Sequence, residues 1–197
     1  MSNEFSTSQV DDVARTKVVF CYPIVNGYIA ACWRALASDP RIDLSILSFA
    51  SQKTDSVGFH TNIMRGLDHH LLEPESKKDP KRVSQLVEEL NPDMLFVSGW
   101  AYPAFRKLYS NFALAKVPTV MLMDNQFRGD FRQMAGRYLL SRILRRINFL
   151  FVTGERAHQL ARYWAVPEEK IDRSYSGLYP GSDTSRCSKS SSASSPR

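Results

Sequence analysis

The stretch DMLFVSGWAYPAF, residues 93–105, decides the fold class. Residues 94–97 form a continuous apolar run without the alternation of a half-exposed strand, which is typical of a strand covered on both faces. Gly99 then breaks the run, and Pro103 leads into a helix that we expect over 104–115. A buried strand followed at once by a helix is one repeat of a parallel α/β sheet.

The same strand-then-helix unit recurs along most of the chain. Asp79 followed by Pro80 has the residue types preferred at a helix N-cap and at the first helical position. The sequence predicts an α/β fold, a Rossmann-like doubly wound parallel sheet of about six strands. The other expected strands span 17–22, 44–49, 69–72, 118–123 and 149–153, and the other expected helices span 28–38, 79–90, 131–147 and 155–164.

The two ends of the chain differ in composition from the middle. Residues 1–15 are polar and rich in Ser and Asp, and residues 181–197, GSDTSRCSKSSSASSPR, are dominated by Ser. Neither segment carries enough apolar side chains to bury a core, so we expect both to be disordered. The sequence therefore predicts one domain over 16–180 between two disordered tails.

Composition excludes several classes of protein. Apolar residues make up 43% of the chain and charged residues 23%, as in ordinary globular proteins. No apolar run reaches the roughly 18 residues of a membrane-spanning helix, and the N-terminus lacks the apolar core of a signal peptide. The cysteines and histidines show no metal-ligand spacing. We expect a cytoplasmic protein with no metal ion and no cofactor.

The chain is basic, with 26 Lys and Arg against 20 Asp and Glu and a formal net charge of +6. Such a balance permits binding to phosphorylated ligands, anionic lipid or nucleic acid. Aromatic residues are not interleaved with the basic ones as stacking platforms for bases require, and no nucleic-acid-binding motif occurs. We therefore expect no nucleic-acid partner.

Three loops are expected to meet where a ligand would bind. In an open parallel sheet, ligands lie beyond the carboxyl ends of the strands, where the strand order reverses. With the common order 3-2-1-4-5-6, the loops at that point are 23–27, 99–103 and 124–130.

The first two loops each allow a functional and a structural interpretation. Asn26 and Gly27 could let a ligand approach a helix N-terminus, which favours anions, or could form an ordinary turn. Gly99 and Trp100 place an aromatic face at a strand end, where it could stack on a sugar. Alternatively, Trp100 packs over the edge of the sheet.

The loop DNQFRGD, residues 124–130, carries the densest polar signal. Asp124, Asn125 and Arg128 can bind hydroxyl or phosphate groups with paired hydrogen bonds. Asp124 could also act as a general base. The alternative is a solvated loop in which Asp130 caps the next helix.

The predicted helix 131–147 is basic and amphipathic, with an apolar stripe at Leu139, Leu140, Ile143, Leu144 and Ile147 and no acidic residue. Such a helix can lie against the anionic inner face of a membrane. The alternative is a helix that packs on the core and turns a solvated basic side outward. Its basic residues are Arg132, Arg137, Arg142, Arg145 and Arg146.

From about Thr16 to Tyr179 the chain resembles the N-terminal domain of GT-B-fold glycosyltransferases, specifically the retaining family 4 (group 1). Ala165 departs from the pattern, because the family usually has Gly there. The resemblance is carried by KVVFCYPIVNGYIAACWRAL (17–36), PDMLFVSGWAYPAF (92–105), VPTVMLMDNQFRGDFRQ (117–133), RRINFLFVTGERAHQLARYWAVPEEKI (145–171) and GLYP (177–180).

The resemblance implies transfer of a sugar from a nucleotide sugar to a glycan or lipid-linked acceptor, with Asp124 at the position of a family base. In that family the N-terminal domain shapes the acceptor side, and a C-terminal domain with a Glu-x7-Glu motif grips the nucleotide diphosphate. No such pair of glutamates occurs in this sequence. We therefore expect a truncated enzyme that is inactive alone. The alternative is a non-enzymatic module that binds a saccharide or a protein in the same cleft.

Overall fold

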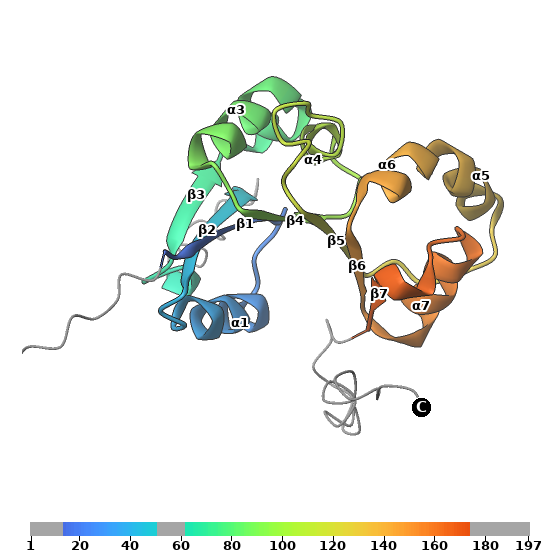
Figure 1. The fold of residues 1–197 in the computed structure, drawn as a ribbon, viewed down its shortest axis with the longest axis horizontal. Helices are drawn as coiled ribbons and strands as arrows, with labels where there is room; N and C mark the ends of the chain where they lie inside the picture. The colour runs from blue at the N-terminus through green and yellow to red at the C-terminus, as the bar shows by residue number, and fades with distance from the viewer. Residues whose placement is uncertain (1–13, 51–61, 174–197) are drawn as a thin grey trace, which may run out of the picture.

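The computed structural model describes residues 14–50 and 62–173, which form a single sheet of parallel strands (Figure 1). The strand order is β3-β2-β1-β4-β5-β6-β7, so the predicted Rossmann-like α/β fold is confirmed. Residues 171–172 add one strand beyond the expected six, because they pair with β6. The strands are β1 (Thr16–Cys21), β2 (Ile42–Phe49), β3 (Asp68–Leu72), β4 (Met94–Ser98), β5 (Thr119–Met123), β6 (Phe149–Val152) and β7 (Ile171–Asp172).

Helices connect most of these strands. Asp79 caps α3 as predicted, since its side chain accepts hydrogen bonds from the backbone N–H groups of Lys81 and Arg82. Except for residues 14 and 15, the tails predicted at 1–15 and 181–197 lie outside the described residues. The helices are α1 (Gly27–Ala37), α3 (Pro80–Leu90), α4 (Pro103–Leu108), α5 (Phe131–Leu139), α6 (Ser141–Arg146) and α7 (Gly154–Tyr163), with 3-10 turns η1 (Pro74–Lys78) and η2 (Glu168–Lys170).

Two helix predictions were wrong in extent. The helix expected over 131–147 is two helices, α5 and α6, that meet at Leu140. At this junction the Ser141 hydroxyl donates to the Tyr138 carbonyl, and such a bond competes with the regular helix pattern. The helix expected to reach residue 115 ends at Leu108, where Ser110 and Asn111 bond to nearby backbone groups instead.

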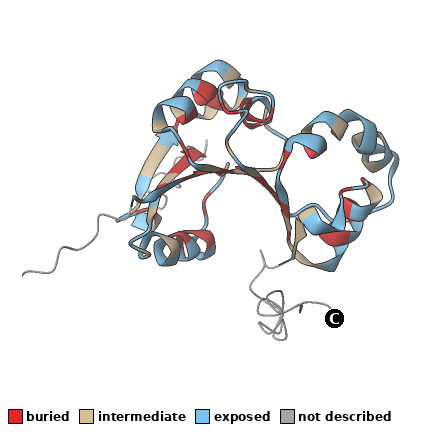
Figure 2. Ribbon diagram, in the orientation of Figure 1, coloured by how far each residue is buried: buried red, intermediate tan, exposed pale blue. Residues whose placement is uncertain are grey.

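The helices cover the two faces of the sheet unevenly. Figure 1 shows α3 and α4 above the sheet and α1 below it. The upper core includes Leu95, Met121 and Leu150 and continues under α6 and α7. On the lower face, α1 packs Trp33 over β1 and β2, and Phe149 on β6 stays 48% exposed. Buried residues accordingly concentrate along the middle of the sheet (Figure 2).

Tyr109, just after α4, fixes the end of the central strand β4. Its hydroxyl lies 2.8 Å from the Gly99 carbonyl oxygen and 3.3 Å from that of Val97. Burial raises the pKa of this phenol well above its usual value, so the hydroxyl remains a donor. The contact ties the loop after β4 to the core.

Removing this hydroxyl should destabilise the fold. We expect Tyr109→Phe to lower the free energy of unfolding by about 1–3 kcal/mol, because buried carbonyl groups lose their donor. Urea unfolding measures the change. Tyr138→Phe is the matched control, since Tyr138 is 75% exposed, and its unfolding midpoint should stay unchanged. Equal midpoints for the two variants would show that the Tyr109 contact contributes nothing.

Candidate functional site

The strand order reverses between β1 and β4, and the three predicted loops follow β1, β4 and β5 at that point. The backbone N–H of Gly99 donates to the Leu122 carbonyl at 2.9 Å, which ties the loop after β4 to β5. Gly99 has a φ of +59°, a left-handed conformation that favours glycine. The topology therefore gathers these loops at one edge of the sheet.

The loop after β1 ends in a capped helix. The Asn26 side-chain oxygen accepts the backbone N–H of Ile29 at 2.9 Å, which makes Asn26 the N-cap of α1. Gly27 is the first residue of that helix, and the space where its side chain would lie is open. The geometry agrees with an ordinary turn, and the open space beside Gly27 also leaves room for a ligand.

Trp100 packs against a second tryptophan. Its ring meets that of Trp164 edge to face, with centroids 4.9 Å apart and planes at 69°. Trp164 follows α7, and its indole N–H donates to the Gln133 carbonyl at 2.8 Å. The sequence offered two interpretations of Trp100, stacking on a sugar or packing over the edge of the sheet. In the structure its ring packs against Trp164.

Gln133 holds the loop after β5 in shape. Its side-chain oxygen accepts the backbone N–H groups of Arg128 at 2.8 Å and Gly129 at 3.0 Å. Its side-chain nitrogen donates to the Gln126 carbonyl at 2.7 Å. Asp130 caps α5, as one interpretation expected, by accepting the backbone N–H of Gln133 at 2.9 Å.

The role of Gln133 was not predicted, although the sequence carries a signal for it. An N-cap residue followed three positions later by Glu or Gln is the pattern of a capping box. Asp130 and Gln133 have that spacing. Here the glutamine side chain reaches beyond the cap to the preceding loop residues. The loop is thus shaped by one side chain that lies outside it.

Asp124 lies between two hollows in the surface. The first, of about 540 Å³, is mainly apolar and is lined by Phe20, Trp33, Phe96 and Phe151, with Asn26, Asp124 and Thr153 among its polar residues. The second, of about 570 Å³, is mainly polar and is lined in part by Trp100, Asp124, Asn125, Arg128, Arg132 and Gln133. Gly27 and Gly99 line neither hollow.

Asp124 is therefore shared by the two hollows and connects the two groups of predicted site residues. It is exposed and directly follows the last residue of β5. A carboxylate at this position can accept a proton from a ligand bound on either side. Asn125 and Arg128 can donate hydrogen bonds to hydroxyl or phosphate oxygens in the polar hollow.

The three histidines in the described residues do not line either hollow. His69 and His70 lie on β3, as expected. His158 lies within the helix expected over 155–164, where it is only 4% exposed, and its Nε2 lies 2.7 Å from Glu168 Oε1. It is buried because α7 turns this side toward η2. In the described part of the chain, no cluster of His, Cys, Asp or Glu could hold a metal ion.

None of the described helices is both long and apolar enough to cross a membrane.

Comparison with known proteins finds similarity only at the level of structure. No protein-family model matches the sequence, and no curated protein matches it. A UDP-N-acetylglucosamine 2-epimerase shares the fold with a TM-score of 0.58 at 13% identity, over 80% of this chain and 45% of that one. A putative UDP-N-acetylglucosamine 2-epimerase from Listeria monocytogenes gives 0.58 at 11% identity, over 80% and 44%.

A third similar structure is the S. aureus MnaA–UDP co-structure, with a TM-score of 0.56 at 14% identity, over 79% of this chain and 42% of that one. At these identities the likeness shows the fold alone. The chain spans less than half the length of each of the three proteins. The shared part is the Rossmann-like parallel sheet with its flanking helices.

The role of Gln133 can be tested at the backbone groups that it binds. In Gln133→Ala the amides of Arg128 and Gly129 lose their acceptor, so we expect their hydrogen exchange to accelerate about fivefold or more, the equivalent of one hydrogen bond. Gln159→Ala on α7 is the control, because Gln159 bonds only to the exposed Glu155 in the described structure. Unchanged exchange at both amides would contradict the role of Gln133.

Proposed function

We propose that this chain is the acceptor-side domain of a glycosyltransferase that uses a nucleotide sugar, with Asp124 as the general base. The observation that carries the proposal is the place of Asp124. It stands at the carboxyl end of β5, beside the reversal of strand order, and borders both a polar and an apolar hollow. The fold shared with one domain of UDP-N-acetylglucosamine 2-epimerases supports a nucleotide-sugar substrate.

The two hollows suit the two kinds of surface that a glycan or lipid-linked acceptor presents. In the polar hollow, Asn125, Arg128 and Arg132 offer donors to hydroxyl or phosphate oxygens. In the apolar hollow, aromatic rings such as Phe96 and Phe151 offer faces to a sugar ring or to an apolar chain. The acceptor hydroxyl would then lie at Asp124, between the two.

The proposed reaction moves one glycosyl group. The acceptor oxygen forms a bond to the anomeric carbon of the donor, and its proton passes to the Asp124 carboxylate. The bond from the anomeric carbon to the nucleoside diphosphate breaks, and the diphosphate leaves with the electron pair. Asp124 contributes as a base only if the acceptor hydroxyl lies within hydrogen-bond reach.

The nucleoside diphosphate leaving group needs charged donors on the opposite side of the cleft. We assign these donors to a separate domain outside these 197 residues. The similar solved structures are more than twice as long as the part of them that this chain covers. Stabilisation of developing charge is usually the largest catalytic contribution, and one lost donor commonly costs about 100- to 1000-fold in rate. Catalysis also needs donor and acceptor held together.

The chain alone should not turn over a nucleotide sugar. We expect purified protein, mixed with a panel of nucleotide sugars and saccharide acceptors, to release no nucleoside diphosphate above a heat-killed control. If the protein releases nucleoside diphosphate and Asp124→Ala abolishes that release, the chain is active alone. This result would overturn the assignment of the leaving-group donors to a separate domain. Asp43→Ala, which removes an exposed aspartate on β2, is the matched control.

A further inference from the structure

The helix α5 turns its apolar side to solvent. None of its residues is buried. Phe131, Met134 and Tyr138 recur at the spacing of one helix face, and they are 80%, 39% and 75% exposed. Leu139, at the end of the helix, is 79% exposed. The apolar stripe predicted from the sequence packs inward only further on, at Leu140, Leu144 and Ile147.

The inner side of α5 is occupied by contacts that fix this orientation. Gln133 bonds to the loop before the helix. A side chain at Gly136 would meet the ring of Trp164 at 3.1 Å, so the helix approaches that ring closely. The exposed apolar stripe of α5 therefore cannot turn toward the core without breaking these contacts. This stripe consists of Phe131, Met134, Tyr138 and Leu139. Exposed apolar side chains gathered in this way mark an interaction surface.

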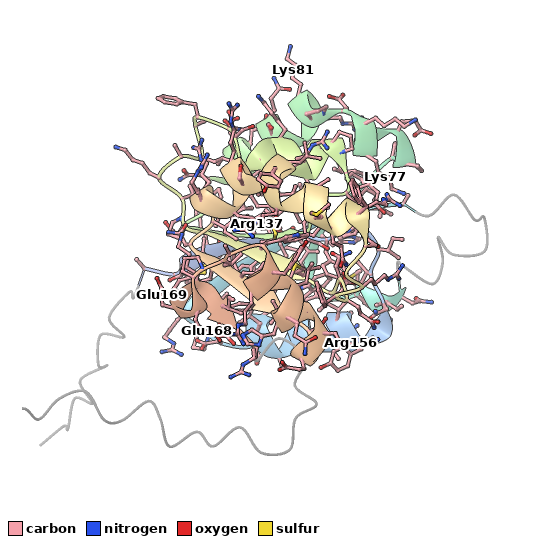
Figure 3. The ribbon with its side chains drawn as sticks, turned by 90° about the vertical axis from the view of Figure 1, so that its right-hand side faces the viewer. Lys77, Lys81, Arg137, Arg156, Glu168 and Glu169 are labelled. Atoms are coloured by element: carbon pink, nitrogen blue, oxygen red, sulfur yellow. The ribbon has the colours of Figure 1, made fainter. Side chains whose placement is uncertain are left out.

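The surroundings of the stripe are strongly basic. Residues 131–147 contain five arginines and no acidic residue, and all five are exposed: Arg132, Arg137, Arg142, Arg145 and Arg146. On the neighbouring η2, Glu168 is paired with His158 at 2.7 Å. Figure 3 looks onto this side of the molecule, with Arg137 above Glu168 and Glu169.

A hollow of about 410 Å³ opens beside the stripe, between α5, α6 and the segment after α7. Arg137, Arg145 and Lys170 line it together with apolar side chains that include Leu144 and Trp164. The Lys170 ammonium donates to the Ile147 carbonyl at 2.9 Å, which holds it at this place. Three cations over an apolar floor suit a phosphate that carries an apolar group.

We propose that α5 and α6 dock this protein onto an anionic lipid surface. Phe131, Tyr138 and Leu139 enter the boundary between headgroups and acyl chains, and the arginines contact lipid phosphates. The hollow between Arg137, Arg145 and Lys170 takes one headgroup phosphate. This inference does not rest on the proposed sugar transfer.

Charge decides between a lipid surface and a second copy of the chain as the occupant. A second copy placed face to face would bring the arginines that border this surface, such as Arg137 and Arg145, close to their own copies, and like charges repel. An anionic bilayer offers both features that the surface lacks, a dense layer of negative charge and an apolar interior. The apolar stripe would add nothing to binding of a purely ionic partner.

The test is co-sedimentation of the whole chain with two kinds of vesicle. One kind contains phosphatidylcholine alone, and the other contains phosphatidylcholine with about 30 mol% phosphatidylglycerol. We expect binding only to the second kind, weakening as salt rises. The triple variant Arg137→Gln, Arg142→Gln, Arg145→Gln should bind roughly 100-fold more weakly, since each basic residue near such a surface contributes about fivefold. The triple variant Phe131→Ser, Tyr138→Ser, Leu139→Ser should bind at least tenfold more weakly at low salt.

Matched controls come from other parts of the surface. The variant Lys81→Gln, Arg82→Gln, Lys107→Gln removes the same charge from α3 and α4, and Phe112→Ser removes a side chain that is 90% exposed. Lys81 lies well away from Arg137 in Figure 3. Both controls should bind like the unchanged protein, and all changed side chains are exposed, so unfolding midpoints should agree.

Four results would overturn the proposal. Equal binding to neutral vesicles, or binding to neither kind, would exclude an anionic lipid surface. Unchanged binding by the apolar triple variant would show that α5 does not insert and that charge alone holds the protein at the vesicle. Self-association that only the apolar variant abolishes, without vesicle binding, would assign the surface to a second copy.

Discussion

The structure at the candidate site depends on one clamp, formed by Gln133 and Trp164. The Gln133 side chain holds the loop after β5 through the backbone of Gln126, Arg128 and Gly129, while its carbonyl accepts the indole N–H of Trp164. Trp164 in turn supports Trp100 after β4. Loops that follow two different strands are thus joined through one glutamine, and their side chains are held at one edge of the sheet. A site built on such fixed elements keeps its geometry without a ligand.

The same clamp links the site to the proposed lipid surface. Because Gln133 and Gly136 face inward, the apolar side chains of α5 face outward. Arg132 lies between the two features, since it lines the polar hollow beside Asp124 and belongs to the basic helix. A protein docked through α5 would hold Asp124 close to the lipid headgroups. That placement would suit an acceptor whose sugar is attached to a lipid.

Residue patterns predicted most of the fold, and their limits have physical causes. The buried strands were found because continuous apolar runs such as MLFV in β4 need cover on both faces. The order 3-2-1-4-5-6 followed from the usual topology of such sheets and placed the three loops correctly. The break between α5 and α6 was missed, because it depends on a local bond from Ser141 to Tyr138. The burial of His158 could not be predicted from its helix alone, because its partner Glu168 is supplied by a separate turn. The contact of His158 arises from packing between separate elements, and the bond of Ser141 is a local choice of one side chain, and helical spacing encodes neither.

The central claim is that the edge around Asp124 binds a sugar. The most direct measurement is the set of backbone amide shifts of isotope-labelled protein, titrated with nucleotide sugars and with candidate saccharide acceptors. If the claim is right, the first amides to shift are those of Asn26, Asp124, Asn125 and Arg128, and Asp124→Asn weakens the response without changing the fold. Shifts confined to β3 and the far edge of the sheet, with none at these four residues, would contradict it.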